Sequence, residues 1–359
     1  MGIPYMAHQA AASPTEVALD PGVVSPRTAL DNVAERRGPR RTYGALDLGT
    51  NNCRLLIARP SSGGFTVVDA FSRIVRLGEG LGASGVLSDA SMDRAIAALG
   101  ICADKLRRRN VTLARSVATE ACRRARNGDD FAQRVRRETG VVLEIIPPKE
   151  EARLAVLGCH KLLEPGGGPA LIFDIGGGST ELVLVDHGAD DLPRIIAWWS
   201  APWGVVSLTE TEGREALEGP DRIAAYKRMR ERVRRSFHRF VDMLPKDAQD
   251  MRLLGTSGTV TTLASVHLSL PSYDRRAVDG LHVPVDDMRR ISTMIAELDL
   301  AGRSALPCIG AERADMVVAG CAILEAILDI WPAQRLGIAD RGIREGILRS
   351  LMARDGYEL

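Results

Sequence analysis

A short stretch near the middle of the chain, residues 171–186 (LIFDIGGGSTELVLVD), constrains the fold more than any other part of the sequence. Two apolar runs, 171–173 and 182–185, enclose Asp174, three glycines and Glu181. Each run is too short for a buried helix, so the stretch predicts a hairpin of buried strands. A two-residue turn would suffice to join them, so the extra glycine indicates a loop whose backbone N–H groups bind an anion. Asp174 and Glu181 flank this loop as hard oxygen ligands, which favours phosphate with Mg²⁺; a plain glycine-rich hairpin is the alternative.

The same design occurs earlier in the chain, at residues 43–59 (YGALDLGTNNCRLLIAR). An apolar run leads to Asp47 and a Gly-Thr-Asn turn, and a second apolar run follows. Asp47 alone would be explained as a turn former, but its counterpart Asp174 recurs at the same point. A third loop, Gly-Thr-Ser-Gly-Thr at 255–259, follows another apolar run and opens a helix-like stretch. Together the loops predict two similar half-domains that close on a phosphate, as a divergent internal repeat.

The three loops resemble the phosphate loops of the actin, sugar kinase and heat-shock chaperone superfamily. More narrowly, the chain resembles the exopolyphosphatase and guanosine pentaphosphate phosphohydrolase (Ppx/GppA) family over about residues 43–350. The narrower resemblance rests on these motifs, in order: DLGTNNCRLLIA, RLGEGL, VATEACRRARN, KEEARL, DIGGGSTE, GTSGTVTTLA, ERAD and RGIREGIL.

The resemblance implies an α/β fold of two actin-like, ribonuclease H-like domains with an interdomain cleft. No histidine is followed by aspartate, so we expect a short, two-domain form without the C-terminal helical region of long members. The expected parts are a flexible N-terminal tail (1–41), domain I (42–147) and domain II (148–340), with a helix over about 341–353 that can pack back on domain I. Pro147 and Pro148 mark the crossing between the domains.

Hydrophobic periodicity and breaker residues predict the remaining elements. Further strands are expected near 65–73, 113–118, 141–146 and 195–200. Helices are expected near 88–108, 129–138, 150–162, 221–244, 257–267, 286–297, 312–330 and 341–353.

Composition limits the location and the partners. A chain of 359 residues can form two cores, and its formal net charge of +1 gives no general basis for binding nucleic acid or a membrane. Six cysteines without paired spacing predict buried thiols in a reducing compartment. No apolar run approaches the roughly 18 to 20 residues of a membrane span, and the N-terminus has no signal-peptide pattern. We expect a cytoplasmic protein, and the resemblance implies a homodimer.

Hydrolysis of a phosphoanhydride requires charge neutralisation, an aligned water molecule and a proton acceptor. The three loops provide the candidate phosphate ligands Gly49, Thr50, Asn51, Gly176, Gly177, Gly178, Ser179, Gly255, Thr256, Ser257, Gly258 and Thr259. Mg²⁺ keeps several waters and needs few protein carboxylates, so Asp174, Glu181 and Asp47 are sufficient as candidate metal ligands.

Glu150 and Glu151 are the candidates for the catalytic base. A carboxylate in the first turn of a helix beside the domain crossing can face the cleft, where a partly dry site raises its pKa. Both residues can equally serve only to stabilise the positive N-terminus of that helix. The resemblance assigns the catalytic role to the second glutamate of the Glu-Glu-Ala-Arg motif, which is Glu151.

Arginines are natural partners for the trailing phosphates of a polyanion. Arg76, Arg123 and Arg313 lie in the matched motifs and are the first candidates. The predicted helix 221–244 has a basic face that either extends a polyphosphate track or is simply solvated; its cations are Lys227, Arg228, Arg230, Arg232, Arg234, Arg235 and Arg239.

The resemblance implies an exopolyphosphatase that uses Mg²⁺ to release the terminal phosphate of inorganic polyphosphate. The alternative is hydrolysis of guanosine pentaphosphate (pppGpp) at the same site, because both substrates end in a phosphoanhydride. A sugar or acetate kinase would share the loops, but only residues 255–259 suggest a nucleoside pocket. A non-catalytic polyphosphate-binding regulator is the third interpretation, and the presence of Glu151, Asp174 and Glu181 argues against it.

Overall fold

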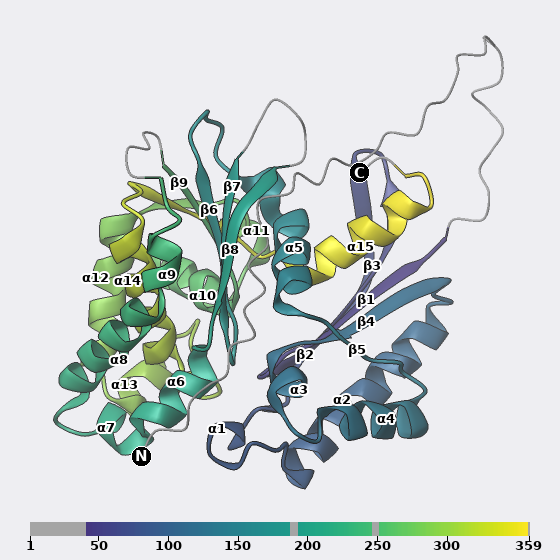
Figure 1. Ribbon diagram of the computed structural model, residues 1–359, viewed down its shortest axis with the longest axis horizontal. Helices are drawn as coiled ribbons and strands as arrows, with labels where there is room; N and C mark the ends of the chain where they lie inside the picture. The colour runs from purple at the N-terminus through teal and green to yellow at the C-terminus, as the bar shows by residue number, and fades with distance from the viewer. Residues whose placement is uncertain (1–40, 187–192, 246–250, 358–359) are drawn as a thin grey trace. The chain divides into compact units, whose positions relative to one another are not determined.

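Two β-sheets organise the chain, which a computed structural model describes over residues 41–186, 193–245 and 251–357 (Figure 1). The first sheet has the strand order β3-β2-β1-β4-β5, and the second has the order β8-β7-β6-β9-β11-β10. In both sheets three antiparallel strands are followed by a parallel one, since β4 pairs with β1 and β9 pairs with β6. The predicted internal repeat is therefore confirmed, and the predicted tail lies outside the described residues except for Arg41.

The strands of the first sheet are β1 (Tyr43–Leu48), β2 (Asn52–Ser61), β3 (Gly64–Ile74), β4 (Leu113–Ala118) and β5 (Glu144–Ile145). Those of the second sheet are β6 (Ala170–Ile175), β7 (Thr180–Asp186), β8 (Arg194–Ala201), β9 (Arg252–Thr256), β10 (His282–Pro284) and β11 (Arg335–Ala339).

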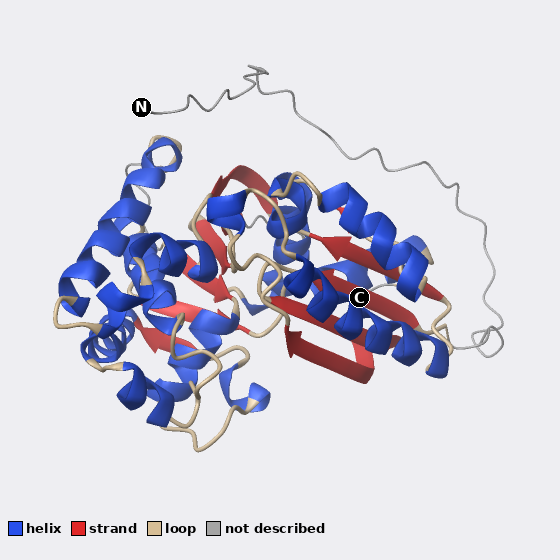
Figure 2. Cartoon of the chain, turned by 90° about the horizontal axis from the view of Figure 1, so that it is seen from below, coloured by secondary structure: helices blue, strands red, loops and turns tan. Residues whose placement is uncertain are grey.

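The helices that accompany the first sheet early in the chain are α1 (Leu81–Ser84), α2 (Asp89–Arg108), α3 (Glu120–Arg124) and α4 (Gly128–Thr139). They are followed by α5 (Pro148–Cys159), α6 (Val205–Glu212), α7 (Arg214–Glu218), α8 (Arg222–Ser236), α9 (His238–Val241), α10 (Gly258–His267), α11 (Arg275–Val278), α12 (Val285–Glu297), α13 (Leu300–Ala305), α14 (Val317–Ile330) and α15 (Ile343–Arg354). A short 3-10 helix spans His160–Leu162. Figure 2 shows these helices lying on both sides of the strands.

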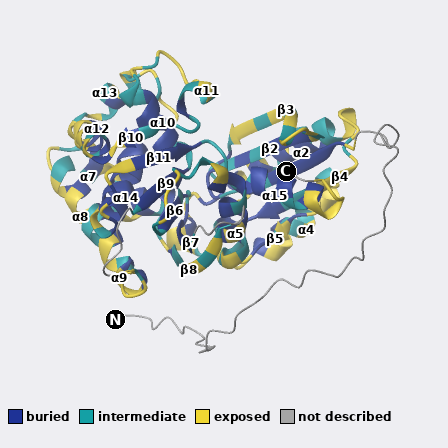
Figure 3. Ribbon diagram, turned by 90° about the horizontal axis from the view of Figure 1, so that it is seen from above, coloured by how far each residue is buried: buried dark blue, intermediate teal, exposed yellow. Residues whose placement is uncertain are grey.

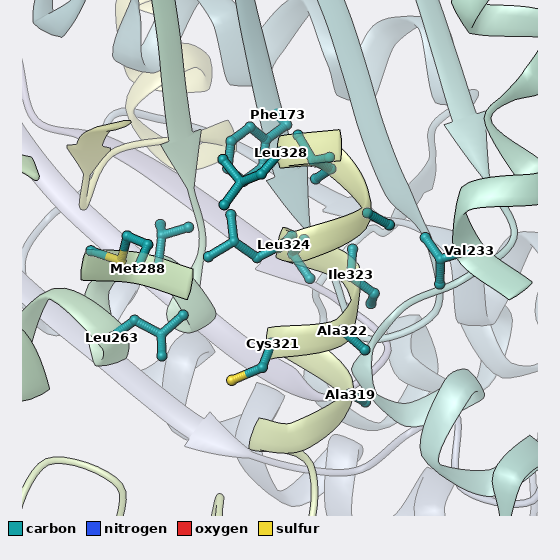
Figure 4. Packing of buried hydrophobic residues seen from close by; sticks show 14 of the residues in the cluster. Phe173, Val233, Leu263, Met288, Ala319, Cys321, Ala322, Ile323, Leu324 and Leu328 are labelled. Carbon is teal, nitrogen blue, oxygen red and sulfur yellow. The ribbon is translucent and has the colours of Figure 1, made fainter. Parts of the chain in front are cut away.

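Each sheet is covered on both faces. Helices α2 and α4 pack on one face of the first sheet, and α5 and α15 pack on the other. One face of the second sheet carries the largest core, which includes α8, α10, α12 and α14 (Figure 4). Helix α14 is buried over most of its length, and Phe173 of β6 packs against it. Its apolar residues therefore anchor the second sheet behind the turn that follows Phe173.

Helices α5 and α15 carry the two crossings between the sheets and pack closely together. Gly158 and Gly346 make this possible, because a Cβ atom on either would collide with a backbone carbonyl of the other helix or its cap. Helix α5 contributes to two cores, with Leu154 facing the first sheet and Val156 the second. The proposed boundary at 147–148 stays a prediction, whereas the return of α15 to the first sheet is observed.

Three predicted elements have different bounds in the structure. The strand expected at 141–146 is only β5, because it pairs with just the last two residues of β4 and Val142 is exposed. The helix expected at 221–244 breaks at Phe237 into α8 and α9, a turn that buries both Phe237 and Phe240. The helix expected at 312–330 begins only at Val317, after a turn that carries Arg313.

Candidate active site

The two matching hairpins form identical turns. Gly49 N–H donates to Asn52 O at 2.9 Å, and Gly176 N–H donates to Ser179 O at 2.9 Å. In register, Asp47 faces Arg54 across the first hairpin and Asp174 faces Glu181 across the second. The repeat thus places an aspartate on each first strand, next to a turn whose remaining amides stay available for a phosphate.

The glycines of the second turn are needed because the two turns touch. A Cβ atom on Gly177 would lie 3.0 Å from Thr50 Cβ and 3.1 Å from Asn51 N. A Cβ atom on Gly178 would lie 2.7 Å from Thr50 Oγ1. The glycine run was interpreted as space for a ligand, and the structure adds a second reason, the close approach of one hairpin to the other.

One cavity brings together most of the predicted site residues. Its lining includes Asp47, Gly49, Thr50, Asn51, Glu151, Asp174, Gly176, Gly177, Gly178, Ser179, Glu181, Ser257, Gly258, Thr259 and Arg313. We call it the main cavity. Residues from both sheets, and from the starts of α5 and α10, therefore converge on one site, as the cleft prediction requires.

Four predicted phosphate ligands lie outside that lining. Gly255 and Thr256 are the last residues of β9, and a Cβ atom on Gly255 would lie 2.5 Å from Phe173 Cζ. Thr256 Oγ1 donates to Arg341 O at 2.7 Å. The strand continues two residues further than the loop prediction assumed, so the amides that face the main cavity begin at Ser257.

Arg76 and Arg123 are also bound elsewhere. Arg76 forms an ion pair with Asp315 at 3.2 Å, across the two halves of the molecule. Arg123 donates to Glu120 at 2.7 Å and to Glu151 at 3.1 Å. Arg123 thus lies behind the predicted base and orients it, instead of lining the main cavity.

The structure distinguishes Glu151 from Glu150. The Glu150 side chain pairs with Arg115 at 2.8 Å and with Arg153 at 2.7 Å, outside the main cavity. Burial opposes ionisation there, but the hydrogen bonds from both arginines lower the pKa of Glu150. Glu151 is only 7% exposed and lines the main cavity. Burial, with repulsion from Glu181, raises the pKa of Glu151 well above its usual value, so Glu151 has the environment of a proton acceptor.

Three further carboxylates crowd the same site. Burial and repulsion from Glu181 raise the pKa of Asp174 to about 8. Burial raises the pKa of Glu181 to about 7, although Ser179 and Ser200 donate to it at 2.7 and 2.9 Å. Burial also raises the pKa of Asp47, whose Oδ1 atom is buried without a hydrogen-bond partner. Arg54 and Arg344 partly offset the charge of Asp47, and its orphaned carboxylate oxygen among the other acids is where a cation would fit.

These residues fit Mg²⁺ as the cation. In the part of the chain that the structure describes, no three His, Cys, Asp or Glu side chains form a ready-made metal-binding group. Zinc sites are built from such groups, whereas Mg²⁺ commonly takes one or two carboxylates and completes its shell with water and substrate phosphates. The acid pair of Asp47 and Asp174, with Glu181 beside it, agrees with the second pattern.

Sequence reasoning missed several residues of the main cavity: Asn52, Arg54, Glu120 and Thr262. Arg54 had a usable signal, because superposing the two hairpins aligns it with Glu181. Thr262 accepts a hydrogen bond from Arg313 Nη1 at 3.1 Å, which only the fold of α10 against the turn before α14 brings about.

The basic face of α8 lies away from this site. No residue of α8 lines the main cavity, and Figure 3 shows exposed stretches along the helix. Arg230 pairs with Glu325 at 2.5 Å and Asp329 at 2.6 Å, and Arg228 pairs with Glu212 at 2.5 Å. Arg234 and Arg235 pair with Glu231. These contacts favour the solvated face over the polyphosphate track.

Comparison with known proteins decides the family. The model of the Ppx/GppA phosphatase family matches residues 56–355. The chain belongs to this family. Exopolyphosphatase 2 of Mycobacterium tuberculosis is 31% identical to this Ppx/GppA protein, and the match covers 86% of this chain and 97% of the relative. The guanosine-5'-triphosphate,3'-diphosphate pyrophosphatase of Aeromonas hydrophila is 29% identical, and the match spans 59% of that longer protein.

The crystal structure of the Aquifex aeolicus member of the Ppx/GppA family superposes with a TM-score of 0.72. It is 29% identical, and the match covers 89% of this chain and 100% of that one. The predicted actin-like, two-domain α/β fold is therefore confirmed. Among the described residues of this Ppx/GppA protein, every helix is too short or too polar to cross a bilayer.

Proposed function

We propose that this Ppx/GppA phosphatase is an exopolyphosphatase that hydrolyses the terminal phosphoanhydride of inorganic polyphosphate with Mg²⁺. The observation that carries the proposal is the position of Glu151. It is a buried carboxyl of raised pKa that faces an acid-lined cavity, whose walls are glycine-rich turns suited to phosphate.

The main cavity suggests how the reaction proceeds. Unbonded amides in the turns at 49–52 and 176–179, with Ser257 and Gly258, would bind the oxygens of the terminal phosphate. Arg313 lines the same cavity and would bind a neighbouring phosphate. Asp47, Asp174 and Glu181 are the carboxylates from which Mg²⁺ would take its one or two protein ligands, and the ion would neutralise the charge that develops on the transferring group.

Glu151 would then remove a proton from a water molecule while the oxygen of that water bonds to the terminal phosphorus. The anhydride P–O bond breaks, its electron pair stays on the shortened chain, and inorganic phosphate is released. Arg123 holds Glu151 at 3.1 Å and is itself held by Glu120 at 2.7 Å, so the base keeps its orientation during the transfer.

Hydrolysis of pppGpp is a second candidate at the same site. It is supported by the apolar side chains Ile74, Val205, Met316 and Val317, which join the polar turns in lining the main cavity and would suit a nucleoside. The similarity to the Aeromonas hydrophila relative supports it as well. We also propose a homodimer, as the resemblance implies, and a cytoplasmic location, as the six cysteines without paired spacing suggest.

One assay tests these proposals against each other. Phosphate release is measured from long polyphosphate, tripolyphosphate and pppGpp, with Mg²⁺ and without any other nucleotide. Turnover of polyphosphate supports the exopolyphosphatase, and a much higher kcat/KM for pppGpp supports the second candidate. Binding of polyphosphate without phosphate release would instead indicate a non-catalytic regulator. Light scattering of the purified protein tests the homodimer, which a monomeric mass would contradict.

A further inference from the structure

A second cavity lies next to the main one. It is lined by Thr256, by residues 339–344 between β11 and α15, and by part of the acid site. Its volume of about 40 Å³ would hold about three water molecules. The cavity is partly open to solvent, and the side chain of Arg341 in its lining is 36% exposed.

The two cavities share a wall. Asp47, Arg54, Asp174, Ser257 and Ile343 line both of them. The turns at 49–52 and 176–179 line only the main cavity, whereas Thr256 and Arg344 line only the second. The second cavity therefore begins at the acid pair and leads away from the turns that suit the terminal phosphate.

Unpaired cations lie at the second cavity. Among the described residues, the side chains of Arg54 and Arg344 form no hydrogen bond or ion pair, and both act electrostatically on Asp47. Arg341, by contrast, is bound to Asp279 at 2.8 Å, and the Asp340 carboxylate is bound to Arg275 at 3.1 Å. Among the arginines that line the second cavity, Arg54 and Arg344 are thus the two without a carboxylate partner. Arg54 lies on the shared wall, and Arg344 lines only the second cavity.

An exopolyphosphatase, if the proposed function holds, faces a problem of product release. If the terminal phosphate binds at the turns 49–52 and 176–179, it is cut off there while the shortened chain still occupies the rest of the main cavity. The phosphate then leaves either after the chain has dissociated or by another opening. A small cavity that starts at the acid pair and carries unpaired arginines provides such an opening.

We propose that the second cavity binds inorganic phosphate after hydrolysis and releases it while the shortened chain stays in the main cavity. Arg54 receives the phosphate at the shared wall, and Arg344 binds it on the way out. Successive cuts then proceed without dissociation of the chain. The proposal rests on the proposed exopolyphosphatase function and adds a product site to it.

Product inhibition tests the proposal. If phosphate binds the second cavity while polyphosphate occupies the main one, added phosphate should inhibit non-competitively, so that saturating polyphosphate does not relieve the inhibition. Arg344→Gln should raise the phosphate concentration for this inhibition about tenfold, the usual effect of losing one charge-assisted hydrogen bond. The variant should also accumulate chains of intermediate length, and Arg344→Lys should recover part of both effects.

Arg354→Gln is the matched control, because Arg354 lies on the same helix, is exposed and lines neither cavity. Purely competitive inhibition in the wild-type protein would overturn the proposal. An Arg344→Gln variant that matches Arg354→Gln in inhibition and in product lengths would do so too. If the wild-type protein does not cut polyphosphate, the proposed function itself fails, and equilibrium dialysis with labelled phosphate then tests the cavity. Equal phosphate binding in the Arg344→Gln and Arg354→Gln variants would reject it.

Discussion

Adjacent glutamates at the start of α5 allow the proposed base to be tested against a neighbour in the same helical turn. Glu151→Gln keeps the size of the side chain and an oxygen that can accept from Arg123, at 3.1 Å in the native protein. It removes the negative charge and with it the ability to take a proton. We expect kcat to fall by a factor of about 10² to 10⁴, or roughly 3 to 5 kcal/mol of barrier, with substrate affinity largely kept.

The same substitution should not destabilise the protein. Because burial and Glu181 raise the pKa of Glu151, its charged form is disfavoured in the folded state. A neutral glutamine removes that penalty, so the melting temperature at pH 7 should stay level or rise. Glu150→Gln should do the opposite, since it weakens two ion pairs of a side chain that is 22% exposed. We expect it to cost about 1 kcal/mol of unfolding free energy and to change kcat less than about twofold.

The assay combines steady-state phosphate release at saturating polyphosphate with thermal unfolding of both variants. Near-normal turnover in Glu151→Gln, or a larger loss of kcat in Glu150→Gln, would refute the assignment. A loss of both activity and stability in Glu151→Gln would show that the residue acts through structure.

Three other predictions follow from the acid site and from α8. Asp174→Asn and Glu181→Gln should each lower the rate and raise the Mg²⁺ concentration for half-maximal activity, because each removes an oxygen ligand; an unchanged Mg²⁺ titration in both would reject the metal assignment. With Mg²⁺ chelated, unfolding free energy should fall as pH rises from 5 to about 8. These carboxyls have pKa values of about 8 and 7 when folded, against ordinary values of 3.8 and 4.5. These two carboxyls bind more protons in the folded state than in the unfolded state. Their contribution to stability is therefore complete below the ordinary pKa values and is lost as the pH rises through the folded-state pKa values. A melting temperature that does not fall over this pH range argues against buried, ionising acids. Replacing Lys227, Arg234 and Arg235 together by Gln should leave the ratio of kcat/KM for long and short polyphosphate unchanged, and a selective loss on long chains would restore the track on α8.

The hairpins could be predicted because their information is local. Continuous apolar runs and the glycine turns between them define both hairpins, so Asp47 and Asp174 were placed at matching positions from the sequence alone. Arg54 could have been predicted in the same way, since it occupies in one hairpin the position of Glu181 in the other. Comparison of the two hairpins thus carried more information about the residues of the site than each motif did alone.

Contacts between distant segments could not be predicted in the same way. Arg76 and Arg123 carry guanidinium groups suited to binding phosphate, yet their ion pairs with Asp315 and Glu151 determine where these groups point. The break between α8 and α9 has a similar origin, because it arises where Phe237 and Phe240 both reach a core formed by other helices. Hydrophobic periodicity indicates which face of a helix is apolar. Only the tertiary fold determines where the chain must turn to bury that face.

The return of α15 to the first sheet has a consequence for the order of folding during synthesis. One face of that sheet packs Tyr43 and Leu56 against Ile347 and Leu351, which lie about 300 residues later in the chain. A ribosome exposes β1 and β2 long before α15 exists. Helix α5 can cover part of this apolar face early, but the part that α15 covers stays exposed until translation is nearly complete. A chain that stops short of α15 would leave it open to aggregation. The half of the protein that is made first is therefore the half whose core is completed last.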